Sequence, residues 1–340
     1  MIARDEKEAI EWLMGIGAEK VMIQLPDGLK PDSVRIYRYF SSHFRVALSG
    51  NPVYGACDIG TQRCGNYDAV VQYGHSPITN IIYPIPVVFI EWRDNSHINP
   101  SRILLAPLRE RGCKRVGLLS SVQYMNHIPP ISRFLENSGF EVLVGRGDRR
   151  IFHPGQVLGC NYSAAHSISH LVDCFLLITT GKFHGIGMQL SVKKEVLILD
   201  LNTLRIRSIR KEVDDYLKKR YAILSRALDA RRFCISVSSK IGQRRDFLVE
   251  ILKNQLSSLG KEFFVSIDDD ATPQNFENSR CDAVIFTGCP RVALDDQESY
   301  SMPVMTYAEF QQIFGFKDSG RYIMDEIVAV SSDDPSREVG

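Results

Sequence analysis

Strand-like segments recur along this chain at the spacing of one small domain. Short apolar runs rich in β-branched residues come in three successive sets of four, as expected for strands buried on both faces of a parallel sheet. The runs are 21–25, 45–50, 68–74 and 87–92, then 115–120, 141–145, 174–179 and 195–201, and finally 232–239, 262–267, 282–288 and 303–310. The third runs start at 68, 174 and 282, which are 106 and 108 residues apart. This spacing predicts three repeats of one α/β unit of about 100 residues.

Helical patterns separate the first and second strand runs of each set, at 33–44, 131–140 and 246–260. Further helices are predicted at 4–15, 100–111 and 213–230, the last two linking the repeats. Strand–helix–strand alternation implies right-handed crossovers and mainly parallel sheets flanked by helices. The predicted units are residues 1–98, 99–208 and 209–330, followed by a tail at 331–340 that is predicted to be disordered.

Composition narrows the class of protein. The 340 residues include 41 basic and 40 acidic side chains, so the basic excess of a non-specific nucleic-acid binder is missing. The start, MIARDEKEAIEWL, is charged where a signal peptide is apolar, and no run approaches the ~20 apolar residues that span a bilayer. We therefore expect a cytoplasmic protein that contacts neither membrane nor nucleic acid directly. Its eight cysteines should then be free, catalytic or metal-bound.

The cysteines fall into two groups. Four lie in or beside apolar runs and are expected to be small buried hydrophobes: Cys113, Cys174, Cys234 and Cys281. Cys57 and Cys160 lie in glycine-containing loops between the second and third strand runs of their repeats, and Cys289 directly follows a third run. Cys64, seven residues after Cys57, is a rival ligand.

Three distant loop cysteines allow more than one interpretation. From spacing alone, three unrelated cysteines are the simpler one. The alternative is a shared metal centre, because thiolates select zinc and iron–sulfur clusters. Structural zinc normally needs four ligands in close-spaced pairs, so three distant thiolates fit better a [4Fe–4S] cluster with one iron open to substrate. His166 and His170, four apart on a predicted helix, are a weaker metal pair.

The loops that follow the strands are polar or glycine-rich, at the edge where such sheets bind ligands. The segment GIGMQL at 185–190 lacks the third glycine of a dinucleotide fingerprint, and the chain has no G-x-x-x-x-G-K-[ST]. A helix N-terminus after TGKFH could receive a carboxylate or phosphate.

Several of these segments resemble those of a known family. QLPDGL, YGACD, YGHSP, GQVLGC and TGCPRVALDD are similar to segments of the archaeal diphthamide synthases, the 2-(3-amino-3-carboxypropyl)histidine synthases. The resemblance extends from about residue 5 to 325. It implies a triangle of three similar domains around a central [4Fe–4S] cluster, and an archaeal homodimer. It also implies that the cluster ligands are Cys57, Cys160 and Cys289, which leaves Cys64 without a role.

The resemblance further implies a reaction. The reduced cluster binds S-adenosylmethionine at its open iron, and electron transfer cleaves the bond from sulfur to the γ-carbon, releasing methylthioadenosine. The 3-amino-3-carboxypropyl group, as a radical or iron-bound form, adds to C2 of a histidine imidazole in translation elongation factor 2, the first step of diphthamide formation. An electron donor is needed. The close-spaced C-x-x-x-C-x-x-C of ordinary radical S-adenosylmethionine enzymes is absent, in agreement with this family.

Loop position suggests which residues hold the sulfonium ligand. The candidates are Gln24, Asp27 and Gly28 after the first strand run, Gly74, His75 and Ser76 after the third, and Lys182, His184 and Arg291 in the other repeats. A basic side chain could bind the ligand carboxylate, and an Asp its ammonium or ribose. Each candidate could equally be a turn or cap residue. His75 could also remove the proton from C2.

Two rival classes stay open. Quinolinate synthase also has three repeated α/β domains with one cysteine each on a [4Fe–4S] cluster, which there acts as a Lewis acid for dehydration. The segment GCPR-x-A-x-DD speaks against it. The other rival is a non-enzymatic tandem α/β binding protein with a structural zinc or no metal, which would be colourless when purified without oxygen.

Overall fold

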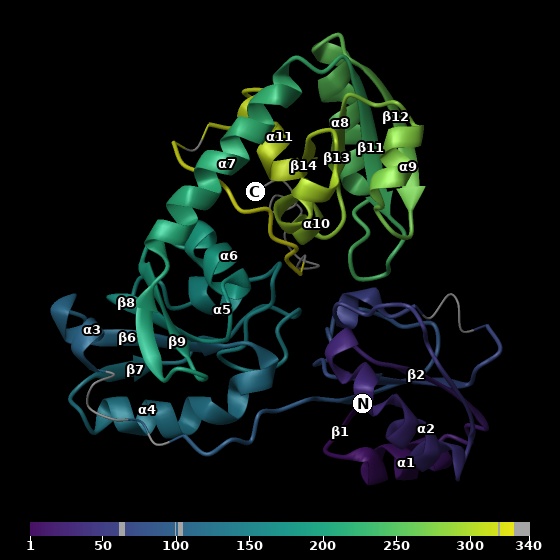
Figure 1. The fold of residues 1–340 in the computed structure, drawn as a ribbon, viewed down its shortest axis with the longest axis vertical. Coiled ribbons are helices and arrows are strands. Elements are labelled where there is room, and N and C mark those ends of the chain that lie inside the picture. The colour runs from purple at the N-terminus through teal and green to yellow at the C-terminus, as the bar shows by residue number, and fades with distance from the viewer. Residues whose placement is uncertain (61–64, 99, 101–104, 319, 330–340) are drawn as a thin grey trace.

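The computed structural model describes residues 1–60, 65–98, 100, 105–318 and 320–329. Figure 1 shows them in three units at the corners of a triangle, with the chain's first unit at the lower right, the second at the lower left and the third at the top. The long helix α7 (Arg210–Leu228) runs from the second unit to the third. Each unit is built on one mainly parallel sheet, which confirms the predicted fold class.

The three sheets share one core strand order, in which the first and third strands of each unit lie side by side between the second and the fourth. The first sheet contains, in spatial order, β1 (Ile2–Ala3), β5 (Val87–Ile90), β4 (Ala69–Tyr73), β2 (Lys20–Gln24) and β3 (Arg45–Leu48). The second contains β10 (Arg205–Ser208), β9 (Glu195–Asp200), β8 (Cys174–Ile178), β6 (Arg115–Ser120) and β7 (Glu141–Leu143). The third contains β12 (Glu262–Asp268), β11 (Arg232–Ser238), β13 (Ala283–Phe286) and β14 (Val304–Thr306).

Helices and 3-10 turns cover both faces of each sheet. In the first unit they are α1 (Glu6–Gly15), η1 (Asp27–Asp32), α2 (Ser33–Ser41) and η2 (Ala56–Asp58). In the second they are α3 (Ala106–Glu110), η5 (Val122–His127), α4 (Ile128–Glu136), α5 (Ser163–His166) and α6 (Phe183–Ser191). In the third, α7 is followed by α8 (Phe247–Ser258), α9 (Pro273–Asn278), α10 (Pro290–Asp295), η6 (Gln297–Ser299) and α11 (Tyr307–Ile313).

The predicted strand runs all contain a strand, but the structure corrects the last one. The run 303–310 is a strand only to Thr306, and α11 begins at the next residue. The Thr306 hydroxyl accepts from Glu309 N and the Glu309 carboxylate accepts from Thr306 N, so a capping box starts the helix. Two strands were not predicted, β1 and the antiparallel β10. The predicted tail at 331–340 lies outside the described residues, and the unit boundaries stay predictions.

One aspartate holds the amino edge of every sheet in the same way. It precedes or begins the third strand of its unit, and one carboxylate oxygen accepts two backbone N–H groups at the start of the first strand. The three sets are Asp68 with Glu19 and Lys20 at 2.9 and 2.8 Å, Asp173 with Lys114 and Arg115 at 2.9 and 2.8 Å, and Asp282 with Arg231 and Arg232 at 3.0 and 2.8 Å. These backbone donors lower the pKa of each aspartate. The three units are therefore alike down to individual hydrogen bonds.

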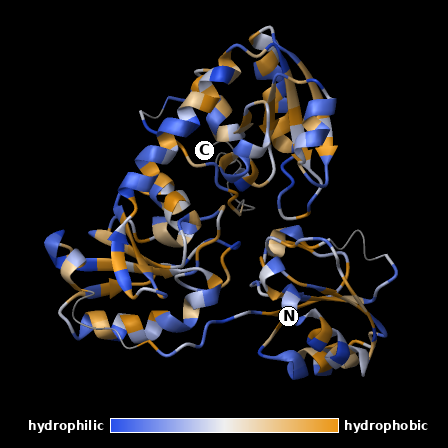
Figure 2. Cartoon of the chain, in the orientation of Figure 1, coloured by the Kyte–Doolittle hydropathy of each residue, from blue (hydrophilic) through white to orange (hydrophobic). Residues whose placement is uncertain are grey.

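Each unit has its own apolar core on the two faces of its sheet. Figure 2 shows the hydrophobic residues along the strands and the inward helix faces, with hydrophilic residues on the outer helix faces. Burial on both sides explains why the strands are near-continuous apolar runs. No helix in the described part of the chain is long and apolar enough to cross a membrane.

Candidate metal centre

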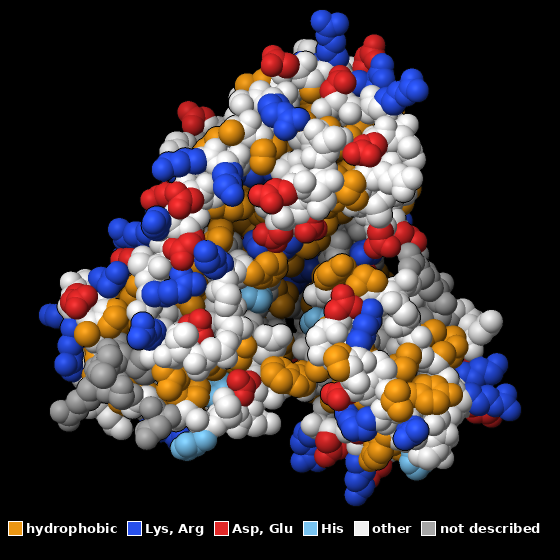
Figure 3. Space-filling view, in the orientation of Figure 1, with side chains coloured by type: hydrophobic (Ala, Val, Ile, Leu, Met, Phe, Trp, Pro, Cys, Tyr) orange, Lys and Arg blue, Asp and Glu red, His pale blue; other side chains and the backbone are white. Residues whose placement is uncertain are grey.

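The three loop cysteines all lie at the carboxyl edges of the sheets. Cys57 is in η2, between β3 and β4, and Cys160 lies between β7 and α5. Cys289 follows β13 and is the N-cap residue of α10. Cys160 is buried, whereas Cys57 and Cys289 are partly exposed. Figure 3 shows a hollow in the surface where the three units meet.

Both other units reach the loop that carries Cys57. Gly242, between β11 and α8, donates its N–H to Cys57 O at 3.1 Å, and Gln243 Nε2 lies 3.5 Å from Cys57 Sγ. A Cβ on Gly242 would overlap Cys57 Cα and lie 2.6 Å from its Cβ, so only glycine allows this approach. Arg150 of the second unit donates from Nη2 to Gly242 O at 2.9 Å. All three units therefore meet beside Cys57.

The three thiols are close enough to act on one another electrostatically. Burial, followed by the charge of Cys160, raises the pKa of Cys57 to about 11. Burial also raises the pKa of Cys289, with Cys160 and Cys57 as the next causes. Burial raises the pKa of Cys160, which the neighbouring Arg150 opposes. Three thiols from three units therefore lie within electrostatic reach of one another.

This donor set suits an iron–sulfur cluster better than a single ion. Among the described residues, no group of three or more His, Cys, Asp or Glu side chains is arranged to hold one metal ion. In a [4Fe–4S] cluster each thiolate binds a different iron, so its ligands lie farther apart. Three neighbouring thiolates repel one another, and bound iron would supply the opposing positive charge. Cys64, the rival ligand, lies outside the described residues.

A buried arginine and the C-terminal segment hold the loops around the cysteines. Arg245 donates from Nε to Thr287 O at 2.6 Å, just before Cys289 in the chain, and forms an ion pair with Asp325 at 2.7 Å. Farther along the same segment, Ile327 N donates to Cys160 O at 2.9 Å. The segment thus links the loops that carry Cys160 and Cys289. Sequence reasoning missed it because no local pattern marks a chain end that packs across two units.

Two of the predicted cofactor-binding residues meet between the second and third units. The guanidinium of Arg291 lies 3.7 Å from the centroid of the Phe183 ring, and its Nη2 donates to Asp295 at 2.7 Å. Burial, then the charge of Arg291, lowers the pKa of the adjacent His184 to about 4. A Cβ on Gly159 would lie 2.6 Å from the Phe183 ring, so this group packs against the residue that precedes Cys160. Lys182, a third candidate, is exposed at the start of α6.

The candidates after β4 lie where the first unit faces the second. Gln72 Nε2 donates to Tyr73 O at 2.9 Å and lies 2.9 Å from His75 Nδ1. Burial lowers the pKa of His75 to about 4. Ser76 is buried and accepts from Gln156 Nε2 of the second unit at 3.2 Å. Gly74 has a φ of 86°.

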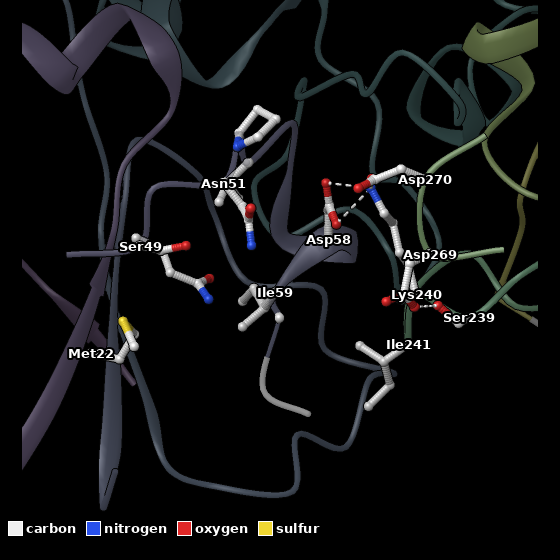
Figure 4. Close-up of a pocket in the computed structure, with 14 residues that line it drawn as sticks. Met22, Ser49, Asn51, Asp58, Ile59, Ser239, Lys240, Ile241, Asp269 and Asp270 are labelled. Atoms are coloured by element: carbon white, nitrogen blue, oxygen red, sulfur yellow. Dashed lines mark hydrogen bonds and ion pairs between the residues drawn. The ribbon is translucent and has the colours of Figure 1, made fainter. Parts of the chain in front are cut away.

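The candidate residues after β2 lie in different places. Gln24 is buried, and its Oε1 has no hydrogen-bond partner among the described residues. It lines a pocket between the first and third units, shown in Figure 4, whereas Asp27 pairs with Lys30 at 2.6 Å and, like Gly28, does not line that pocket. In the pocket, Lys240 lies 3.0 Å from both Asp58 and Asp270 (Figure 4). The ion pair with Asp58 ties the residue after Cys57 to the third unit.

The remaining side chains from the sequence analysis have structural partners. The helix predicted to carry both His166 and His170 is wrong, because α5 ends at His166. The Nε2 atom of His166 lies 2.8 Å from Glu326 and from Ser191. The four cysteines predicted to be buried hydrophobes are buried: Cys113, Cys174, Cys234 and Cys281.

Residues 25–323 match the family described as "Putative diphthamide synthesis protein". The chain belongs to this family. It is 31% identical, over 97% of its length and 96% of the relative's, to the 2-(3-amino-3-carboxypropyl)histidine synthase of Pyrococcus horikoshii. It is 26% identical to subunit 1 of the synthase of that name from Schizosaccharomyces pombe, covering 87% of this chain and 70% of that one. The crystal structure of Dph2 from Pyrococcus horikoshii with a 4Fe-4S cluster superposes with a TM-score of 0.85 at 30% identity, over 98% of this chain and 96% of that one.

Proposed function

We propose that this diphthamide synthesis protein is a transferase. It moves the 3-amino-3-carboxypropyl group of S-adenosylmethionine to imidazole C2 of a histidine in translation elongation factor 2, the first step of diphthamide formation. One observation carries the proposal: the three cysteine loops, one from each unit, lie within electrostatic reach of one another and are linked by contacts between the units. Family membership and relatives named for this synthesis support it. Family membership favours it over the quinolinate-synthase-like dehydratase.

In this proposal Cys57, Cys160 and Cys289 hold a [4Fe–4S] cluster. When reduced, such a cluster supplies one electron at an iron without a protein ligand, which suffices to cleave a sulfonium carbon–sulfur bond. The chain's task is to hold the three thiolates at a fixed separation and to keep water away. The thiolates are held in place by backbone contacts to the loops around them. These contacts come from Gly242, Arg150 and the C-terminal segment.

Arg291 is the residue best placed to hold the substrate carboxylate. Its guanidinium is nearly buried and held between the Phe183 ring and Asp295, next to the loop that carries Cys160. A rigid guanidinium binds a carboxylate through two parallel hydrogen bonds with little loss of side-chain entropy. The neutral His184 beside it adds no competing charge.

His75 acts as a hydrogen-bond donor in this proposal and not as the base. In this role Nδ1 accepts from Gln72 Nε2, which lies 2.9 Å away, and Nε2 carries the ring proton and donates to a substrate or to the target imidazole. The alternative role of His75, removal of the proton from C2, stays a prediction from the sequence. A His75→Gln variant keeps a donor and should retain more activity than His75→Leu.

The cofactor and the chemistry can be tested in one assay. The reconstituted protein, reduced with dithionite without oxygen, is incubated with S-adenosylmethionine and elongation factor 2. We expect a brown protein with about four irons per chain. Methylthioadenosine should form, and the factor should gain ~101 Da, the mass of the aminocarboxypropyl group. Formation of 5′-deoxyadenosine in its place would overturn the proposed bond cleavage.

Cysteine variants identify the ligands. Cys57→Ala, Cys160→Ala and Cys289→Ala should each lose the iron absorbance and all transfer activity, because two thiolates do not retain the cluster. Cys113→Ala is the matched control, since Cys113 is buried at the opposite end of its sheet and should keep both. Cys64→Ala should also keep both. Full iron content in any of the first three variants would remove that cysteine from the ligand set.

The finer expectations about context belong to the same proposal. We place the protein in the cytoplasm of an archaeal cell, as a homodimer that receives its electron from a separate donor. The support is that the chain covers 96% of the Pyrococcus relative, but only 70% of the longer subunit 1 from Schizosaccharomyces pombe.

A further inference from the structure

The third sheet ends in an unusually open edge strand. Strand β12 has 7 residues, and among the described residues its one strand partner is β11, which leaves its other side without a neighbouring strand. The other edge strands of the three sheets, in the described part of the chain, have only 2 to 4 residues. Figure 1 shows β12 at the outer rim of the third unit, beside α9. A long edge strand of this kind is a template for pairing with another strand.

The direction of the free backbone groups follows from the pairing with β11. Glu262 N donates to Arg231 O at 2.9 Å, and Asp268 O accepts from Ser239 N at 3.0 Å. In a parallel ladder, alternate residues point both backbone groups to the same neighbour. The even-numbered residues of β12 therefore face β11. Phe263, Val265 and Ile267 point their N–H and C=O groups out of the sheet.

The same three residues form an exposed apolar row. Their side chains share one face of the strand because successive side chains alternate. Val265 is 38% exposed and Ile267 is 62% exposed, whereas Phe263 is half-buried against the core beneath α8. Natural edge strands of this length are normally blunted by a charge or a proline in the row, and this row has neither. Strand β12 thus offers a partner strand both free backbone groups and an apolar row of side chains.

We propose that the partner is β12 of a second copy of this chain, paired antiparallel about a two-fold axis through Val265. Val265 then faces Val265 of the second copy, and Phe263 faces Ile267, each pair exchanging two backbone hydrogen bonds. The two sheets become one continuous sheet across the dimer. A two-fold axis requires such a self-complementary surface.

Charge favours the antiparallel direction. The start of the third sheet carries Arg231, Arg232 and Lys261, and the end of β12 carries the acidic run Asp268, Asp269 and Asp270. Antiparallel pairing places the basic end of one copy beside the acidic end of the other, whereas parallel pairing would place like charges together. Glu262 is the exception, because it would lie near Asp268 of the second copy. Within each chain, the hydroxyls of Ser236 and Ser266 already donate to the Asp268 carboxylate.

The inference names the surface of the homodimer expected under the proposed function, and it is tested by mass alone. Failure of the pairing would leave the proposed chemistry standing, and failure of the chemistry would leave the pairing standing. Light scattering after gel filtration should give the full-length protein twice its chain mass of 38.5 kDa. A monomer at micromolar concentration would overturn the inference.

Ile267→Lys should shift the protein to monomers by weakening the dimer on the order of 100-fold, because two ammonium groups would enter the apolar row. Val34→Lys on α2 is the matched control, since Val34 is also 62% exposed and lies on another unit. It should stay dimeric. A dimer that survives Ile267→Lys, or one that is lost in Val34→Lys, would contradict the pairing.

A cysteine placed on the axis tests the register and does not depend on how Ile267→Lys folds. Residues in a hydrogen-bonded antiparallel pair have Cα atoms about 5.5 Å apart, within the range of a disulfide. Val265→Cys should therefore give a covalent dimer on mild oxidation. Ile267→Cys would face Phe263 of the second copy and should give none. The reverse pattern would overturn the register.

Discussion

The three units resemble one another more closely at the amino edges of their sheets than at the carboxyl edges. At the amino edge, Asp68, Asp173 and Asp282 accept equivalent pairs of backbone N–H groups. At the carboxyl edge, one cysteine per unit lies in three unlike settings: a 3-10 turn, an irregular loop and a helix N-cap. The amino edge needs only to hold two strands together, so one solution serves three times. The carboxyl edge must bring three different loops to one point, and there the repeats have diverged.

The largest expected effect comes from disturbing the carboxyl edge at its tightest contact. In Gly242→Ala the new Cβ would overlap Cys57, so the loops of the first and third units must separate. We expect iron content to fall and transfer activity to drop about 100-fold, as for a displacement of ~1 Å at a reacting centre. Iron analysis and methylthioadenosine release measure this.

The matched control is Gly15→Ala at the end of α1, where an added Cβ meets nothing within 4 Å. It should leave iron and activity unchanged. Full iron loading in Gly242→Ala would mean that the two loops can move apart without harm to the metal centre, and the contrast between the edges would lose its main support.

A smaller effect is expected at the amino edge. Asp173→Ala or Asp282→Ala removes the acceptor for two backbone N–H groups. Either change should lower the free energy of unfolding by about 1 kcal/mol. The effect is small because water reaches these carboxylates and screens them. Urea denaturation measures it. Activity of the folded protein should not change, and Asp282→Asn, which keeps an acceptor oxygen, should lose less. Lost activity with unchanged stability would show that this edge also serves the chemistry.

The smallest effect is a pH dependence at the same edge. Backbone N–H groups lower the pKa of Asp68, Asp173 and Asp282, so each carboxylate stabilises the fold above its unfolded pKa of about 3.9. That contribution is lost as pH falls through the lowered folded values. The stability difference between the wild type and the triple Asp→Asn variant should be constant from pH 7 to 5 and shrink below about pH 4. A difference that persists at pH 3 would assign the loss to geometry and not to charge.

Much of the fold could be predicted because its signal is local. Buried parallel strands are continuous apolar runs, and each predicted run contains a strand. The failures have physical causes. Strand β1 has only 2 residues, and β10, with the sequence RIRS, has one apolar residue, so neither shows a pattern. The boundary at Thr306 has a local signal, the Thr-x-x-Glu capping box, but that signal lies inside an apolar run that reads as one strand.

The candidate site was less predictable. Loop position and the family resemblance singled out Cys57, Cys160 and Cys289, and loop position indicated Arg291 and His184. The residues that hold the cysteine loops, Gly242, Arg150 and Arg245, have no local signal. Gly242 and Arg150 act through backbone atoms of another unit, and Arg245 acts through the backbone of a distant loop in its own unit. Asp27 and Gly28 fit the loop rule equally well, yet Asp27 is paired with Lys30 at the surface.

The amino-acid sequence by itself determined three α/β units, their strands, and one cysteine loop at the ligand-binding edge of each. These features depend on apolar periodicity and on residues within a few positions of one another. Only the tertiary structure decided that the three edges face one hollow, that Arg291 lies on Phe183, and that β12 keeps an open edge. Such facts depend on contacts between residues far apart in the chain, and no local pattern encodes which distant loops will touch.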